Sequence, residues 1–471
     1  MFNASVEMFK RTMIGKKVSV VGLGVSNLPA IEFLSECGAV ITACDKTPED
    51  KLSKEALEVI ENYCDYSYLG EDYLDHFDGE DIILRSPGIK PFMPQFKEAV
   101  EKGTILTSEM EIFMSLCPCK MIGITGSDGK TTTTTLISKI LEKADIRCHV
   151  GGNIGTPLLN KLDKIHSDDF VVLELSSFQL MNMNVSPDIA VITNISPNHL
   201  DYHRDMTEYV AAKAQIFKNQ SKDGKLVINR DNASTAAFYG KQNGKAEFFS
   251  RKYKESGAYV DDGWLCYNGE KIVKTSDIRI KGSHNVENYL AAIAAVREFV
   301  EAEHIREVAI NFGGVEHRME FVREVDGISF YNDSIGSSPT RTIAGLLAHE
   351  GDIVLIAGGY DKNLDYEELG CVIRDRVQSL VVVGQTADKI KQAVARAFGR
   401  RDLIPIVHET SFEKAIETAF NSAKGLKRKN VTCSVILSPA SASFDMFKNF
   451  MERGDRFKKI VHEMKPHDER I

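Results

Sequence analysis

The stretch from Met121 to Leu136, MIGITGSDGKTTTTTL, combines residue types that bind phosphate. A short apolar run leads into a glycine-rich loop, and Lys130 and Thr131 directly follow the last glycine of that loop. Glycines let the backbone adopt positive φ and approach a ligand closely. The helix predicted after the loop directs its free N–H groups at an anion. A lysine and a threonine at this point are typical of a site for nucleotide phosphates and a magnesium ion.

This loop departs from the usual phosphate-binding motif G-x-x-x-x-G-K-[ST], because Ile124 stands where the first glycine is expected. A G-K-T triplet also occurs by chance in ordinary loops. Its position between an apolar strand and a predicted helix favours the phosphate-binding interpretation.

Two further apolar runs of the central region end in polar residues that could complete this site. The run FVVLE ends in Glu174, a carboxylate suited to binding magnesium beside a phosphate loop. The next run is followed by His199, Asp201 and His203, which form either a metal cluster or an ordinary structural turn. Lys213 lies among alanines in a segment typical of a helix, where a solvated lysine is the simplest interpretation.

A strongly amphipathic helix is predicted in GSHNVENYLAAIAAVREF. Asn285 and Asn288 are three residues apart and therefore share a face, where their amides suit adenine or ribose hydroxyls. Capping of the helix by Ser283 is the alternative. The glycine pair at 313–314 precedes EHRME, a candidate hinge from which Arg318 could reach nucleotide phosphates.

The first segment, KKVSVVGLGVSNLPAIEFLSECGAVITACD, predicts a strand, a glycine turn, a helix and a second strand, as in dinucleotide-binding folds. Gly22 and Gly24 form the turn, and Asp45 ends the second strand. Asn27 replaces the third glycine of the motif, which favours a nucleotide diphosphate over NAD, with a dehydrogenase as the alternative. A later strand leads to Ser86 in RSPG, a loop that could bind phosphate or uracil or be a simple turn.

Four apolar runs in the last third of the chain also open into polar residues: ISFYNDS, IVLIAGG, SLVVVGQT and SVILSPASAS. Parallel strands present such residues to a ligand at their carboxyl ends. We therefore expect a second dinucleotide-type fold that binds a small anion through Lys362, Ser441 and Ser443.

The composition is that of a compact enzyme. A length of 471 residues predicts about three domains, and a net charge of −9 argues against a general nucleic-acid binder. No apolar run reaches the roughly 18 residues of a membrane span, and the first residues lack a signal-peptide pattern. The nine scattered cysteines are typical of a reducing cytoplasm. A zinc site at Cys117 and Cys119 is disfavoured, because no second cysteine or histidine cluster is near them.

In order and spacing, these motifs resemble the Mur ligases over nearly the whole chain. The motifs are TGSDGKTTTT, GGNIG, ELSSFQL, NISPNHLDYH, SHNVENYLAA, EHRME, YNDS, LIAGG and LSPASASFDMFKNFMERGDRF. The resemblance implies an α/β protein of three domains. A Rossmann-like UDP-substrate-binding domain at 1–108 precedes a central P-loop ATP-binding domain with a mainly parallel sheet at 109–313. A Rossmann-like amino-acid-binding domain at 314–471 follows.

The resemblance also implies an ATP- and Mg²⁺-dependent amide ligation in peptidoglycan precursor synthesis. The carboxylate of UDP-N-acetylmuramoyl-L-alanine would take the γ-phosphate of ATP, and the amine of D-glutamate would then displace phosphate from the acyl phosphate. We expect a cytoplasmic monomer that works on these small molecules and binds neither nucleic acid nor a membrane.

The roles that the resemblance implies fall on matching positions of this chain. Lys130, His199 and Lys213 would be catalytic, and the metal ligands would be Thr131, Glu174, His199 and a carbamate of Lys213. The implied ATP contacts are Gly126, Ser127, Asp128, Gly129, Lys130, Thr131, Thr132, Asn285, Asn288, Arg318 and Asp333. The implied contacts to the UDP substrate are Ser26, Asn27, Asp45, Lys46, Ser86, Asn153 and Ser176. The implied D-glutamate contacts are Ser337, Lys362, Ser443, Phe444 and Phe450.

One position departs from the family pattern. The family often has lysine where this chain has Ile335, whereas Ser337 keeps the hydroxyl of the usual threonine. One active-site cation must therefore come from elsewhere or be absent. A folylpolyglutamate synthetase is the alternative within the family, but it would lack the UDP-type first domain. A nucleotide-gated binding protein is the alternative outside it, but it would lack Lys213, His199 and the hinge arginine.

Overall fold

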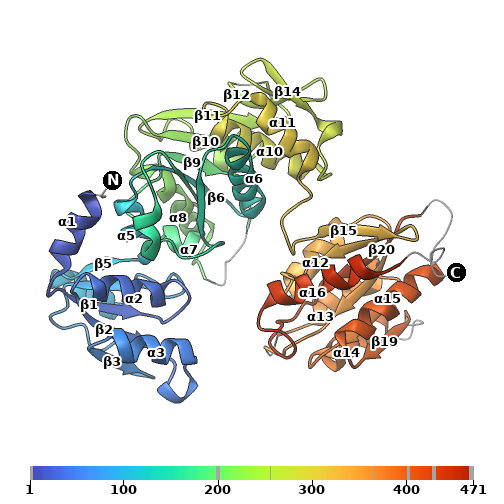
Figure 1. Cartoon of the computed structure of the whole chain (residues 1–471), viewed down its shortest axis with the longest axis horizontal. Helices are drawn as coiled ribbons and strands as arrows, with labels where there is room; N and C mark the ends of the chain where they lie inside the picture. The colour runs from blue at the N-terminus through green and yellow to red at the C-terminus, as the bar shows by residue number, and fades with distance from the viewer. Residues whose placement is uncertain are drawn as a thin grey trace. The chain divides into compact units, whose positions relative to one another are not determined.

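The computed structural model describes residues 4–197, 202–254, 256–362, 364–399, 404–426 and 431–465. The chain divides into two compact units, Met1–Phe312 and Gly313–Ile471 (Figure 1). The first unit contains two β-sheets, and the second unit contains one.

The first sheet is parallel throughout, with strand order β3-β2-β1-β4-β5. Its strands are β1 (Lys17–Val21), β2 (Val40–Asp45), β3 (Tyr66–Leu69), β4 (Ile82–Arg85) and β5 (Ile105–Thr107). The helices of this region are α1 (Ala4–Met13), α2 (Asn27–Glu36), η1 (Glu49–Lys51), α3 (Lys54–Tyr63), α4 (Pro94–Glu101) and α5 (Glu109–Leu116). The strand order reverses between β1 and β4, the point where open α/β sheets bind ligands. The predicted Rossmann-like fold is confirmed.

The second sheet has the order β14-β13-β12-β11-β10-β9-β6-β8-β7 and is parallel except for the β12–β14 meander at one edge. Its strands are β6 (Lys120–Thr125), β7 (Cys148–Gly152), β8 (Phe170–Glu174), β9 (Ile189–Ile192), β10 (Lys225–Asn229), β11 (Lys245–Ser250), β12 (Gly257–Asp261), β13 (Trp264–Tyr267) and β14 (Glu270–Lys274). The helices here are α6 (Lys130–Lys143), η2 (Leu159–Lys164), α7 (Ser177–Leu180), α8 (Met206–Lys218), α9 (Ala233–Ala236), η3 (Thr275–Asp277), α10 (Ser283–Val296) and α11 (Ala302–Asn311). Because β6 lies between β8 and β9, the ends of these three strands meet at one edge.

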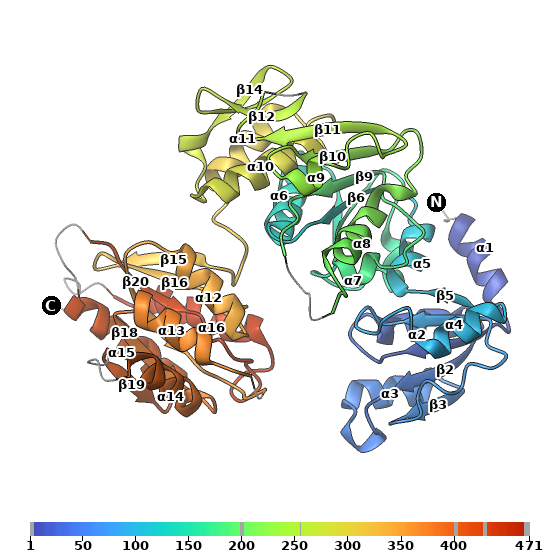
Figure 2. The ribbon, with the colours of Figure 1, turned by 180° about the vertical axis from the view of Figure 1, so that it is seen from behind.

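Helix α10 differs from the prediction. Every residue from Asn288 to Val296 is buried, so the helix is not amphipathic beyond its first turn. The reason is that α10 packs on β10–β12 and is also covered by α6 (Figure 2). Its first turn is also not capped by Ser283, because Gly282 is the N-cap residue and no side chain caps it.

One apolar cluster joins the two sheets of the first unit. It includes Val18 and Leu34 near the first sheet, Phe113 of α5, and Leu173 and Phe217 near the second sheet. The predicted boundary at residue 108 lies within this continuous core and stays a prediction. No helix in the described ranges has the length and apolar character needed to cross a bilayer.

The second unit has a six-stranded sheet with the order β15-β16-β20-β17-β18-β19. Only the edge pair β15–β16 is antiparallel, so this unit is also Rossmann-like. The strands are β15 (Glu320–Val325), β16 (Ile328–Asn332), β17 (Asp352–Ala357), β18 (Ser379–Val383), β19 (Ile406–Glu409) and β20 (Cys433–Leu437). The helices are α12 (Pro339–Ala348), α13 (Glu367–Arg376), α14 (Ala387–Phe398), α15 (Phe412–Leu426) and α16 (Phe450–Glu463).

Candidate functional site

The predicted phosphate loop connects the end of β6 to the start of α6. Gly126 has φ 150°, and a Cβ added there would lie 1.9 Å from Thr193 Oγ1. Gly129 has φ 79° and is the N-cap of α6, and a Cβ there would lie 2.3 Å from Asn288 Oδ1. Both positions therefore require glycine, because a side chain would collide with a neighbouring element.

The segment after β9 holds the loop in shape. The Asn194 side chain accepts from the Asp128 N–H at 3.0 Å and donates to the Asp128 carbonyl at 3.1 Å. Ser127 donates its N–H to the Asn194 carbonyl, and its hydroxyl lies 3.0 Å from the Tyr209 hydroxyl of α8. These bonds leave the N-terminus of α6 facing the loop, as an anion site requires.

Two lysines converge on the carbonyl of Gly126. Lys130 Nζ donates to it at 3.0 Å and to the Ser127 carbonyl at 2.8 Å, and Lys213 Nζ donates to the Gly126 carbonyl at 2.8 Å. Lys213 is only 2% exposed, so the interpretation as a solvated lysine is wrong. It is buried because α8 packs against β6 and β9 beneath the loop.

Burial holds the pKa of Lys213 well below its ordinary value, and the neighbouring Lys130 charge lowers it further. Asp128 and Glu174 oppose this effect without cancelling it. A larger share of Lys213 is therefore a neutral amine near pH 7, and a neutral amine is the form that reacts as a nucleophile.

Glu174 ends β8 beside the loop, in register with Ile124 of β6. It is 1% exposed, and its Oε1 accepts a hydrogen bond from Asn153 Nδ2 at 2.7 Å. Its Oε2 is also buried, yet no donor among the described residues bonds to it. A buried carboxylate oxygen in this state is costly, and a hard cation would satisfy it.

The other residues predicted for the nucleotide lie around the same loop. Asn288 contacts the start of α6, with its Oδ1 3.4 Å from Thr133 Oγ1, and its Nδ2 donates to Asn285 Oδ1 at 3.3 Å. The expected shared face of Asn285 and Asn288 is confirmed. Thr131 and Thr132 are half-buried in the first turn of α6.

The predicted histidine cluster cannot be assembled from the described residues. His199 and Asp201 lie outside the described residues, so their predicted roles stay predictions. His203 is buried, and its Nε2 lies 2.9 Å from the Ser177 hydroxyl. Within the described ranges, no group of three or more possible metal ligands is found, including around Cys117 and Cys119.

Five of the residues predicted for the UDP substrate lie at the ends of β1, β2 and β4, near the β1–β4 switch point: Ser26, Asn27, Asp45, Lys46 and Ser86. Asp45 accepts from the Leu23 N–H at 2.7 Å and from the Thr47 N–H at 2.8 Å, so it fixes two loops. Asn27 is buried and donates to the Gly22 carbonyl at 2.8 Å. These two side chains therefore fix the backbone of the loops around the switch point, because their hydrogen bonds are made to backbone groups.

The remaining members of this set are more accessible. Ser26 and Ser86 are half-buried, and Lys46 is exposed. Ser86 lies against Gly22, where an added Cβ would come within 2.7 Å of the serine Cβ. Ser176 belongs to the second sheet, where its hydroxyl forms a capping box with Gln179 at the start of α7.

Arg85, a residue that the sequence did not single out, ties the Ser86 loop to α7. It is 3% exposed, and its guanidinium donates to the carbonyls of Ser86, Ile89, Phe178 and Met181 at 3.3, 2.9, 3.3 and 2.9 Å. The motif RSPG contained this arginine, but its partners near residue 180 are not visible in the sequence.

In the second unit, Asp333 follows β16 and is 4% exposed. Its Oδ2 accepts from the Ser438 hydroxyl at 2.6 Å, and its Oδ1 accepts from the Met319 N–H at 3.1 Å. Burial raises the pKa of Asp333 to about 6, although these hydrogen bonds oppose the shift. Arg318 is exposed, and the contact of both residues with a nucleotide stays a prediction.

Of the residues predicted to bind the amino acid, Lys362 and Phe444 lie side by side. Lys362 Nζ lies 5.3 Å from the centre of the Phe444 ring, which is 58% exposed. Ser443 is buried, whereas Ser337 and Phe450 are half-buried.

The prediction that Ser441 binds the anion is not supported. Ser441 is fully buried, and its hydroxyl lies 2.8 Å from the Thr386 hydroxyl and 3.0 Å from the Tyr366 hydroxyl. The side chain therefore points into the core, where the Tyr366 and Thr386 hydroxyls hold it.

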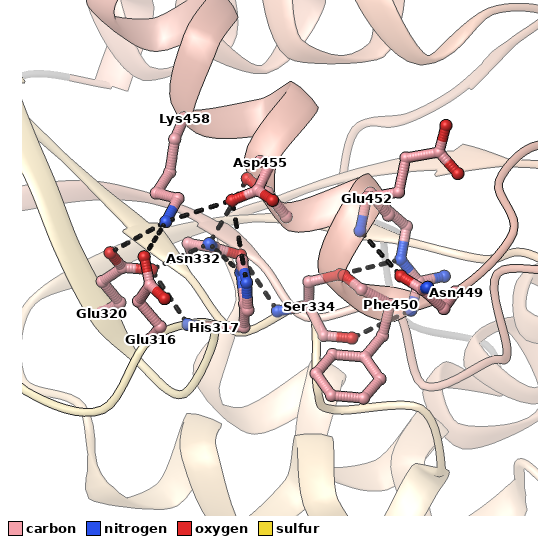
Figure 3. A network of polar contacts seen from close by, with 12 residues as sticks. Glu316, His317, Glu320, Asn332, Ser334, Asn449, Phe450, Glu452, Asp455 and Lys458 are labelled. Atoms are coloured by element: carbon pink, nitrogen blue, oxygen red, sulfur yellow. Dashed lines mark hydrogen bonds and ion pairs between the residues drawn. The ribbon is translucent and has the colours of Figure 1, made fainter. Parts of the chain in front are cut away.

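A polar network connects the residues around β15 and β16 to α16 (Figure 3). Asn332 donates to Glu320, and its Nδ2 lies 3.0 Å from His317 Nδ1, while Lys458 pairs with Glu316 and Asp455. 

The buried Arg453 supports the turns after β16 and β20. Its guanidinium donates to Ser334 and to the carbonyls of Ser441 and Ala442. Sequence reasoning missed Arg453 and His317 as organising residues, because each acts through partners far along the chain.

Comparison with known sequences gives three matching domain families. Residues 16–108 match the MurD-like N-terminal domain of Mur ligases, residues 124–296 match the Mur ligase middle domain, and residues 317–431 match the Mur ligase glutamate ligase domain.

Full-length relatives are also similar. The chain is 51% identical over 469 residues to UDP-N-acetylmuramoylalanine--D-glutamate ligase of Acetivibrio thermocellus, covering 98% of this chain and 99% of the relative. It is 46% identical over 476 residues to the enzyme of the same name from Ruminiclostridium cellulolyticum, covering 98% and 100%.

Solved structures share the fold at lower identity. UDP-N-acetylmuramate-alanine ligase MurC from Thermotoga maritima superposes with a TM-score of 0.54 at 16% identity, covering 95% of this chain and 100% of that chain. MurF from Acinetobacter baumannii superposes with a TM-score of 0.56 at 17% identity, covering 83% of this chain and 92% of that chain.

Proposed function

Because this chain belongs to the Mur ligase family, we propose that it joins D-glutamate to UDP-N-acetylmuramoyl-L-alanine with consumption of ATP. The observation that carries the proposal is the 51% identity, over 98% of the chain, to a ligase named for this reaction. The reaction would supply a precursor of peptidoglycan.

ATP phosphates are proposed to lie on the loop from Gly126 to Thr131, at the N-terminus of α6. Support comes from the two glycines that keep this loop free of side chains and from the Lys130 ammonium folded across it. When phosphates bind, Lys130 would exchange its two carbonyl acceptors for phosphate oxygens, which are stronger charged partners. Asn285 and Asn288 would meet the nucleoside.

The residues at this edge fit a magnesium ion. Thr131, Glu174 and the Lys213 carbamate would hold it, together with His199, and the buried Oε2 of Glu174 supports this assignment. When bound, Mg²⁺ would neutralise the charge of the transferring phosphoryl group. The lowered pKa of Lys213 supports the carbamate, since only the neutral amine reacts with CO₂.

The proposed reaction has two steps. The acceptor carboxylate attacks the γ-phosphorus of ATP, and ADP leaves. The neutral amine of D-glutamate then attacks the acyl carbon, inorganic phosphate leaves with the C–O bonding electrons, and the nitrogen releases one proton to give the amide. Lys130 and the N–H groups of the loop stabilise negative charge as it develops, so they act mainly by preorganised electrostatics.

The two Rossmann-like sheets would each bind one of the other two substrates. We assign the UDP portion to the β1–β4 switch point, near Ser26, Lys46 and Ser86, where the loops are fixed by Asp45 and Asn27. We assign D-glutamate to the second unit, where the cation of Lys362 beside Phe444 suits a carboxylate.

Phosphate release tests the proposal. It should require ATP, Mg²⁺, UDP-N-acetylmuramoyl-L-alanine and D-glutamate together, and Lys130→Ala should lower kcat by roughly 100-fold or more. Equal turnover with L-glutamate, or turnover without the UDP substrate, would overturn the assigned substrates.

We also propose that the protein works in the cytoplasm. All nine cysteines, which lie in the described ranges, are free thiols, as expected of a cytoplasmic protein. We also propose a monomer without nucleic-acid or membrane partners, which size measurement in solution would test.

A further inference from the structure

Two thiols lie in contact where α5 leads into β6. Cys117 Sγ is 3.7 Å from Cys119 Sγ, with Pro118 between the two residues. A disulfide bond is about 2.05 Å long, so the sulfurs need to approach by only about 1.7 Å to bond. This is the one sulfur–sulfur contact recorded among the described residues, although the chain has nine cysteines.

The two thiols differ in access and in acidity. Cys117 is half-buried, whereas Cys119 is 8% exposed. Cys117 Sγ also lies 3.7 Å from the carbonyl oxygen of Cys119, to which its thiol donates. The contact between the two thiols lowers the pKa of Cys117, and the same contact together with burial raises the pKa of Cys119. An attacking thiol needs access and thiolate character, so Cys117 is the one that reacts first.

We propose that Cys117 and Cys119 form an oxidisable dithiol whose substrates are small-molecule disulfides. The Cys117 thiolate attacks one sulfur of the disulfide RSSR, and RS⁻ leaves with the electron pair of the broken S–S bond. Cys119 loses its proton to solvent and attacks Cys117 Sγ, and the second RS⁻ leaves. Two protein thiols are oxidised to one disulfide, and RSSR is reduced to two RSH.

This site lies away from the phosphate loop. Cys119 directly precedes β6, and the loop begins at the other end of that strand, about 20 Å away for six residues. Near the thiols, the Met121 N–H donates to Asp188 at 2.8 Å, which anchors the first residues of the strand. The thiols therefore lie outside the phosphate site, so the proposal does not depend on the proposed function.

The sequence makes the test direct. Trypsin cleaves after Lys102 and Lys120, so residues 103–120 form one peptide that contains only these two cysteines. Cys371, the one cysteine classed as exposed in the described chain, lies in a separate tryptic peptide and serves as an internal control.

The folded full-length protein is incubated with oxidised glutathione, alkylated, digested and analysed by mass spectrometry. The peptide 103–120 should lose two hydrogens and take neither glutathione nor alkyl groups, whereas Cys371 should carry glutathione. Excess reduced glutathione should reverse the change. Retention of glutathione on wild-type Cys117, or alkylation of both thiols while Cys371 reacts, would overturn the proposal.

Two variants separate the steps. Cys119→Ser should trap glutathione on Cys117, because the resolving thiol is gone, and Cys117→Ser should leave Cys119 unmodified. Rapid glutathione addition to Cys119 in Cys117→Ser would contradict the assigned order. The wild-type measurement stands even where a variant folds poorly.

Discussion

Lys130 and Lys213 donate to the same oxygen, the carbonyl of Gly126, at 3.0 and 2.8 Å. Desolvation lowers the pKa of the buried Lys213, and the Lys130 charge lowers it further, because two ammonium groups that share one acceptor repel each other. The phosphate loop therefore has its own lysine, Lys130, suited to bind phosphate, and beside it Lys213 of α8, suited to react as a neutral amine.

Replacing Lys213 tests its chemical role. Lys213→Ala should lose most ligase activity, and short carboxylic acids such as acetate should restore part of it by supplying the carboxylate that the carbamate provides. The measurement is phosphate release against acid concentration. Lys218→Ala, at the exposed last residue of α8, is the matched control and should keep the wild-type rate with or without added acid. Absence of any rescue would remove the support for a carbamate.

The stability of the first unit should depend on Lys213 and pH. The folded pKa is lowered, so the unfolded chain binds more protons up to its own pKa of about 10.4, and stability rises with pH in that range. Lys213→Met should remove this dependence and should be at least as stable at pH 7, because no buried ammonium remains.

Urea unfolding followed by the single tryptophan, Trp264, reports on the first unit. Buffers freed of CO₂ keep Lys213 unmodified. Parallel pH profiles for the wild type and Lys213→Met would show that the lysine is not desolvated.

Glu174 should determine the magnesium requirement. Glu174→Gln keeps the size of the side chain but removes the charge on Oε2, so the Mg²⁺ concentration for half-maximal activity should rise by about 10-fold or more. Asp169→Asn is the control, because Asp169 is also buried but lies before the first residue of β8 and bonds to His149. An equal magnesium shift in both variants would indicate a general effect on folding.

Asp333 should make the second unit less stable as the pH rises from 4 to 6. Its folded pKa is about 6 against 3.8 unfolded, so the native state binds more protons in this window, and ionisation is unfavourable above it. Asp333→Asn has no carboxyl group to ionise at this position. Its free energy of unfolding should therefore rise by up to about 3 kcal/mol relative to the wild type between pH 4 and 7.

Hydrogen exchange in peptides from β16 and β20 measures this effect, because the tryptophan lies in the first unit. In Ser438→Ala, the pH range over which stability falls should move to higher pH, since the Ser438 hydrogen bond opposes the raised pKa of Asp333. An unchanged window in Ser438→Ala would argue against this bond.

The sequence predicted the elements whose signal is local. The strand before the phosphate loop, the helix after it, and Glu174 and Asp333 at strand ends all follow from apolar runs that stop at polar residues. The burial of Lys213 could not be predicted, because its neighbours are alanines and the packing of α8 decides its environment. The β12–β14 meander and the inward turn of Ser441 likewise depend on contacts between elements.

Arg85 is the clearest case of a role set by long-range contacts, since two of its acceptors are the carbonyls of Phe178 and Met181. It joins the Ser86 loop to α7, which follows Glu174 by three residues, and so it fixes the proposed acceptor site relative to the phosphate loop. Removing it leaves several buried carbonyls unsatisfied, and Arg85→Met should lower the free energy of unfolding by about 3 kcal/mol.

Kinetics distinguish positioning from stability at this residue. In Arg85→Met, KM for the UDP substrate should rise at a temperature where the variant is folded, while KM for ATP stays near the wild-type value. Arg85→Lys can satisfy some of the carbonyls. It should therefore recover part of the lost stability and part of the wild-type KM for the UDP substrate. Lys102→Ala, which breaks only exposed ion pairs with Asp78 and Glu98, should match the wild type. Equal increases in both KM values would mean that Arg85 supports the unit as a whole and does not position the acceptor.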